Sequence, residues 1–153
     1  MKFTIPLHFI DLHDDGYHPI VEVMIFGKLF KLVLDTGASK TALDHAVLLQ
    51  ANAEAAIDAS DSLSTGLGTN SMASFTAIIQ DMSIGELPIP AFTVAVLDLS
   101  AINIAYSQLG HPEVLGVLGS DILMKYKAVI DYGKRELKLK KKAGKKTGRK
   151  SKK

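Results

Sequence analysis

One acidic residue follows a buried apolar segment, where an unpaired carboxylate would be unfavourable. Asp35 follows an apolar segment, Leu29 to Leu34, that only Lys31 interrupts, and it opens the run Thr36-Gly37-Ala38-Ser39. An unpaired buried charge costs several kcal/mol or shifts its pKa. One interpretation is a simple turn, since Asp, Thr, Gly and Ser all favour turns. The other is a carboxylate placed for acid–base chemistry, and a second motif downstream favours this one.

The second motif is Val117-Leu118-Gly119, about 80 residues after Asp35. A glycine is needed where two backbones pass closely. The two motifs together resemble those of the aspartic proteases, in which an apolar-apolar-Gly stretch packs through the catalytic loop. The order of elements between them is similar to that of the retroviral-type family: strand, flap-like Gly loop, hairpin, Gly-rich segment and short helix. The resemblance covers roughly residues 15–140.

The resemblance implies a mechanism with two carboxylates about 3 Å apart that share one proton and activate a water. This chain has a single Asp-Thr-Gly. Asp98 is the only rival, but it lacks the Thr and Gly and is better explained as a turn at a helix start. We therefore expect a homodimer in which the second carboxylate is Asp35 of another copy, because a two-fold axis brings equivalent residues together.

The resemblance also implies a role for each residue of the loop. Asp35 is the general acid and base, and the Thr36 hydroxyl braces the two loops across the axis. Gly37 lets the loop turn close to the substrate, while Ala38 and Ser39 line the edge of the cleft.

A flap is expected in the turn-rich segment 61–72, where it would close over an extended peptide and exclude water. Its residues are Gly66, Leu67, Gly68, Thr69 and Asn70. A strand follows this segment, whereas a phosphate-binding loop would open into a helix, so a nucleotide site is disfavoured.

Two features depart from the retroviral pattern. Ser120 stands where those proteins usually have a basic residue that braces the dimer, and Asp121 is expected to be the N-cap of a short helix. Retroviral chains end in a strand that joins the dimer sheet, whereas this chain runs on into Lys-rich sequence.

The resemblance implies an all-β fold, a single-lobe acid protease closed barrel with two or three short helices. Gly27-Lys28 is expected to form a type II′ or related hairpin turn. Helices are expected from Thr41 to about residue 57, over 101–108 with Ser100 as N-cap, and up to about residue 126. The strands are predicted over residues 3–10, 20–26, 29–34, 75–84, 92–97, 128–132 and 136–140.

Charge is distributed unevenly along the 153 residues. Residues 1–133 carry 6 basic and 15 acidic side chains, a net charge of −9, whereas residues 134–153 carry 12 basic and 1 acidic, a net charge of +11. We expect one protease domain over residues 1–140 and a disordered Lys-rich tail over 141–153. The tail leaves open a nucleic-acid-associated protein that acts through it. A non-catalytic dimeric peptide-binding module of the same fold is the other alternative.

Several classes of function find no support in the sequence. The chain has no cysteine, which excludes thiolate chemistry and disulfides. Its five histidines have no metal-ligand spacing, so neither a metal nor another cofactor is expected. No apolar run reaches the ~20 residues of a membrane helix. The first residues lack the pattern of a signal peptide, so a cytoplasmic location is the default expectation.

Overall fold

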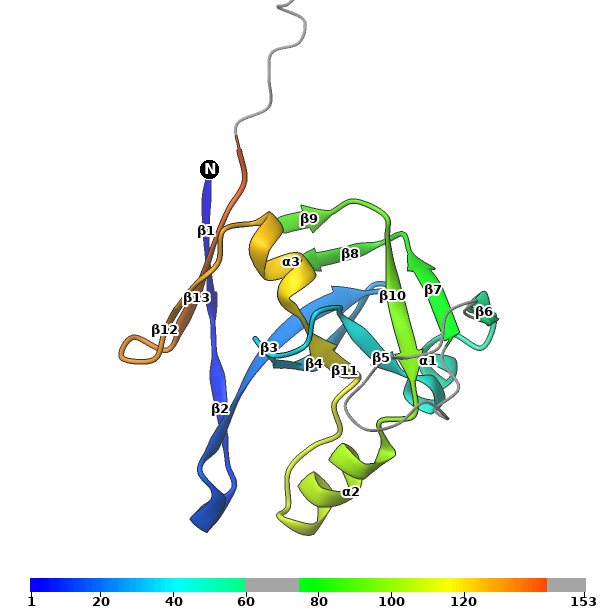
Figure 1. Ribbon diagram of the computed structural model, residues 1–153, viewed down its shortest axis with the longest axis horizontal. Coiled ribbons are helices and arrows are strands. Elements are labelled where there is room, and N and C mark those ends of the chain that lie inside the picture. The colour runs from blue at the N-terminus through cyan, green and yellow to red at the C-terminus, as the bar shows by residue number, and fades with distance from the viewer. Residues whose placement is uncertain (60–74, 143–153) are drawn as a thin grey trace, which may run out of the picture.

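The computed structural model describes residues 1–59 and 75–142. Within these ranges the chain is built mainly from short strands, with three short α-helices and one 3₁₀ turn, η1 (His13–Asp15) (Figure 1). The helices are α1 (His45–Ala51), α2 (Ser100–Gln108) and α3 (Ser120–Lys125). The strands are β1 (Lys2–Pro6), β2 (His8–Asp11), β3 (Tyr17–Ile25), β4 (Lys28–Leu34), β5 (Ala42–Asp44), β6 (Ile57–Ala59), β7 (Phe75–Ile79), β8 (Met82–Ile84), β9 (Leu87–Ile89), β10 (Phe92–Leu97), β11 (Gly116–Leu118), β12 (Val129–Asp131) and β13 (Glu136–Lys140).

The strands form two sheets. The small sheet has the order β1-β13-β12, and in Figure 1 it stands to the left of α3. The large sheet has the order β6-β7-β10-β5-β11-β4-β3-β8-β9, with β2 paired to β3. The all-β class with a few short helices is confirmed, but the closed barrel is wrong. Within the described residues β6 and β9 end the large sheet and each has one neighbour, so the sheet stays open.

The three central strands of the large sheet are buried on both faces. Leu34, Leu43 and Leu118 lie in the main core, while Val33, Ala42 and Val117 lie in a second core that includes Tyr106 of α2. Successive side chains of a strand point to opposite faces, so each strand supplies both cores. Double burial explains why residues 32–34 and 114–118 are continuous apolar runs rather than alternating ones.

The predicted first strand is divided between the two sheets. β1 pairs with β13 as far as Pro6, and β2 pairs with β3 from His8 onward. Between them the Leu7 amide donates to the carbonyl of Arg135 at 2.9 Å. The chain therefore changes its partner at Leu7, which an apolar pattern alone does not reveal.

The prediction that Thr41 opens a helix is wrong. Residues 42–44 form β5, which pairs with β10 in parallel and with β11 in antiparallel. The helix α1 starts at His45 and ends at Ala51, with Asp44 as its N-cap. Burial of Ala42 and Leu43 on opposite faces of the sheet outweighs the helical pattern that the sequence shows there.

Two local predictions are refined. The two turn residues of the β3–β4 hairpin are Phe26 and Gly27 rather than the predicted Gly27 and Lys28, because Lys28 already pairs with Ile25. Phe26 and Gly27 both have positive φ, 55° and 73°, so the turn is type I′, a relative of the predicted type II′ turn. The helix α2 begins at Ser100, one residue earlier than predicted, and its N-cap is Leu99 rather than Ser100. No helix of the described residues is long and apolar enough to cross a membrane.

Among the glycines that the structure describes, Gly116 should be the one least able to accept a side chain. A Cβ there would lie 2.0 Å from the carbonyl oxygen of Ala42 and 2.8 Å from Cα of Leu43, both of them backbone atoms that cannot rotate away. We expect Gly116→Ala to lower the free energy of unfolding by at least about 3 kcal/mol, measured by chemical denaturation.

The matched control is Gly110→Ala. Gly110 has a φ of +79°, and no atom lies within 4 Å of the position that a Cβ would take. This variant therefore tests backbone strain without a clash, and we expect a loss of about 1–2 kcal/mol. Equal losses for the two variants would contradict the close approach of β11 to β5.

Candidate active site

The loop that carries Asp35 is held by backbone hydrogen bonds to the end of β11. The Asp35 amide donates to the carbonyl of Leu118 at 3.0 Å, and the Ser120 amide donates to the carbonyl of Ala38 at 2.7 Å. Within the loop the Ala38 amide donates to the carbonyl of Asp35 at 3.1 Å. The segment that follows β4 is therefore fixed at both ends by one stretch of chain some 80 residues further on.

Asp35 is half-buried rather than fully buried. Its Oδ1 accepts a hydrogen bond from the Gly37 amide at 2.9 Å. Its Oδ2 has no hydrogen-bond partner within residues 1–59 and 75–142. One oxygen is thus oriented by the loop, and the other is left for a water or a second group.

Gly119 lies at the crossing of the two segments. A Cβ on Gly119 would lie 2.7 to 2.8 Å from backbone atoms of Ala38 and Lys40, which are part of the Asp35 loop. Val117 and Leu118, just before it, point into the two cores. The segment is therefore anchored by apolar burial and passes the loop without a side chain in the way.

A buried polar network fixes the far end of the loop. Thr41 is 1% exposed, and its hydroxyl donates to Asp121 at 2.8 Å and accepts from the Gly119 amide at 3.0 Å. The Asp121 carboxylate also accepts from the amides of Thr41, at 3.0 Å to each oxygen, and of Ile122 at 2.9 Å. Asp121 thus joins α3 to the residue before β5.

The prediction that Asp121 is an N-cap is therefore wrong. The N-cap of α3 is Gly119, and Asp121 lies inside the helix with its side chain turned toward Thr41. Sequence reasoning misses Thr41 as a site residue, because the expected helix start assigns its hydroxyl to capping. The signal that could find it is a lone hydroxyl directly before a buried Ala-Leu pair, which needs a distant partner.

The remaining predicted loop residues face outward. Thr36, Gly37 and Ser39 are exposed, and Ala38 is half-buried. The Ser39 carbonyl accepts from the Ser120 hydroxyl at 3.4 Å. The predicted flap residues Gly66 to Asn70 lie outside the described residues, so their placement stays a prediction.

The other carboxylates near helix starts are engaged elsewhere. Asp98 is exposed, and hydrogen bonds from the side chain and backbone of Ser100 hold its pKa below the usual range. Asp44 is 3% exposed and accepts from the amides of Leu99 at 2.7 Å and Val47 at 3.0 Å. None of the hydrogen bonds among the described residues joins Asp35 to Asp44, Asp98 or Asp121.

Comparison with known proteins agrees with this geometry. Residues 21–122 match the model of a protein family described as aspartyl protease. A crystal structure of a retropepsin-like aspartic protease from Rickettsia conorii is similar, with 19% identity over 91% of this chain and 90% of that one and a TM-score of 0.54. A retroviral protease-like domain of Ddi1 from Leishmania major has 15% identity over 78% and 86% of the two chains and a TM-score of 0.49. No curated protein matches the chain. The likeness to the Rickettsia structure identifies the fold as retropepsin-like.

The Thr41 hydroxyl should stabilise the place where the Asp35 loop and the segment around Gly119 cross. Thr41→Val keeps the shape of the side chain but leaves the Gly119 amide without its acceptor and removes a donor to Asp121. An unsatisfied buried group costs about 1–3 kcal/mol, and we expect a loss of that size in the free energy of unfolding.

Thr41→Ser retains the hydroxyl and is the matched control, with an expected loss of under about 1.5 kcal/mol from the missing methyl group. If the Val and Ser variants denature at the same urea concentration, the hydroxyl does not support the crossing.

Proposed function

Because the chain belongs to the aspartyl protease family, we propose that it is an aspartic endopeptidase in which two copies pair and each contributes Asp35. The observation that carries the proposal is the carboxylate itself, with one oxygen oriented by the Gly37 amide and the other without a partner in the described residues. A catalytic pair needs a second carboxylate, and Asp44, Asp98 and Asp121 are held by backbone donors at other places.

In this mechanism the two Asp35 carboxylates share one proton, because like charges about 3 Å apart cannot both ionise. The ionised carboxylate takes a proton from the water that attacks the scissile carbonyl, and the protonated one stabilises the carbonyl oxygen. No metal or cofactor enters these steps.

The remaining residues of the loop have roles of their own in this proposal. Thr36 would brace the partner's loop across the two-fold axis, and Gly37 leaves room for backbone close to the substrate. Ala38 and Ser39 would line the cleft, with Gly66 to Asn70 as the flap. The substrate would be a peptide or unfolded segment that binds extended. Residues 1–140 would form the protease domain and 141–153 a tail.

Asp35→Asn should abolish cleavage. The variant keeps the hydrogen-bond acceptor for Gly37 but removes the acidic proton, so we expect the rate of cleavage of an unfolded protein at mildly acidic pH to fall by at least about 10³-fold, with unchanged thermal stability. Cleavage is followed by mass spectrometry of the peptides.

The matched control is Asp98→Asn, an equally conservative change in an exposed turn, which should leave cleavage unchanged. Cleavage that survives in Asp35→Asn would exclude Asp35 as the catalytic group. If the unaltered protein binds peptides without cleaving them under any pH tested, the chain is a binding module of the same fold.

Thr36→Val should weaken the dimer. Thr36 is exposed in the single chain, and its hydroxyl is proposed to form a hydrogen bond with the other copy across the two-fold axis. Without that hydrogen bond, the dissociation constant of the dimer, measured by analytical ultracentrifugation, should rise by about tenfold. Activity at low protein concentration should fall and should recover at high concentration.

Thr93→Val changes an exposed threonine on β10 in the same way and should have no effect on association. A fully active species that sediments as a monomer would contradict the two-copy active site.

A further inference from the structure

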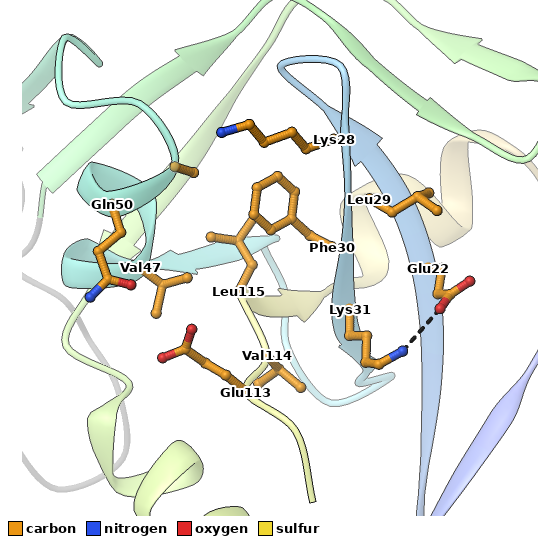
Figure 2. Close-up of a pocket in the computed structure, with 11 residues that line it drawn as sticks. Glu22, Lys28, Leu29, Phe30, Lys31, Val47, Gln50, Glu113, Val114 and Leu115 are labelled. Carbon is orange, nitrogen blue, oxygen red and sulfur yellow. Dashed lines mark hydrogen bonds and ion pairs between the residues drawn. The ribbon is translucent and has the colours of Figure 1, made fainter.

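A cavity of about 360 Å³ lies on the side of the main core, away from the Asp35 loop. It opens between the β3–β4 hairpin, the helix α1 and the segment that leads into β11 (Figure 2). Its volume is within the range of small-molecule sites, roughly 300–1,000 Å³. Asp35 does not line this cavity, so a ligand bound in it would not contact the proposed catalytic group.

The floor of the cavity is apolar and firmly held. Val47 is 8% and Leu115 1% exposed, and the half-buried Phe30 lines the cavity with them (Figure 2). The Leu115 amide donates to the carbonyl of Lys31 at 2.8 Å, which fixes one wall against the other. A preformed apolar floor on rigid elements binds an apolar group without a large ordering cost.

Four charged side chains line the rim, two of each sign. Lys31 and Glu22 form an ion pair at 2.9 Å, and the hydrogen bond from Lys31 holds the pKa of Glu22 below its usual range. Lys28 and Glu113 are exposed and have no ion-pair partner within the described residues. Figure 2 shows their charged groups on opposite sides of the apolar floor.

We propose that this cavity binds a short apolar peptide in its zwitterionic form, with the carboxylate on Lys28 and the ammonium group on Glu113. The signs of the two charges are complementary to those of the two ends of such a ligand, and the floor would take its side chains. Two glutamates on the rim disfavour a phosphate or another polyanion. The proposal rests on the cavity alone and stands whether or not Asp35 is catalytic.

The experiment is a titration of the ¹⁵N-labelled full-length Asp35→Asn protein with the dipeptide Val-Leu, followed by NMR, so that no cleavage occurs. We expect saturable shifts of the amides of residues 28–31, 50–51 and 113–115. The same dipeptide with an acetylated N-terminus and an amidated C-terminus should bind at least about tenfold more weakly, because it has lost both charges.

Lys28→Met and Glu113→Gln should each raise the dissociation constant of the free dipeptide by about three- to fivefold, as expected for exposed ion pairs. Lys28→Arg retains the charge and should bind as the unaltered chain does. Lys2→Met and Glu86→Gln are matched changes of exposed residues outside the cavity and should have no effect.

Three results would each overturn the proposal. One is the absence of saturable shifts around the cavity in the Asp35→Asn protein that keeps Lys28 and Glu113. Another is equal affinity for the free and the blocked dipeptide. The last is a set of shifts confined to residues 35–39, which would place the peptide at the Asp35 loop instead.

Discussion

The close passage of β11 between β4 and β5 is the constraint on which the Asp35 loop depends. Gly116 meets the backbone of Ala42, and Gly119 meets the backbone of Ala38 and Lys40, at distances that exclude any side chain. Because the strands touch through their backbones, the carbonyl of Leu118 and the amide of Ser120 reach the two ends of the loop. Apolar burial of Val117 and Leu118 on opposite faces holds the segment in this passage. The position of one carboxylate is thus set by packing far from it in sequence.

The acidic residues differ in how their carboxylates are hydrogen-bonded. Asp44 and Asp121 accept two or more hydrogen bonds from backbone amides or from Thr41, which compensates for the loss of water around them. Asp98 closes an exposed turn. Asp35 alone among these four combines partial burial of the residue with an oxygen that has no hydrogen-bond partner within the described residues. That difference in bonding agrees with the Asp-Thr-Gly triplet in making Asp35 the candidate.

The sequence is informative where one residue type has one physical reason to be present. The apolar run that ends at Asp35, the glycine of the second motif and the strand 92–97 could be predicted, since each follows from burial or close backbone approach. Residues 42–44 could not, because a helical pattern and a three-residue buried strand compete there and only the neighbours β10 and β11 decide. The bond between Thr41 and Asp121 and the change of sheet at Leu7 likewise depend on partners that no local pattern indicates. The sequence also does not show whether the two end strands of the large sheet, β6 and β9, pair with each other, so an open sheet and a closed barrel could not be distinguished.

Mixing of subunits tests most directly whether the site is shared between two copies. Unaltered chains and Asp35→Asn chains are combined in equal amounts, allowed to exchange, and assayed for cleavage at constant total protein. If both Asp35 carboxylates are required, only dimers of two unaltered chains are active, and activity should fall to roughly a quarter of that of the unaltered protein. Activity of roughly one half, in proportion to the number of unaltered chains, would show that each copy acts alone and would contradict the account.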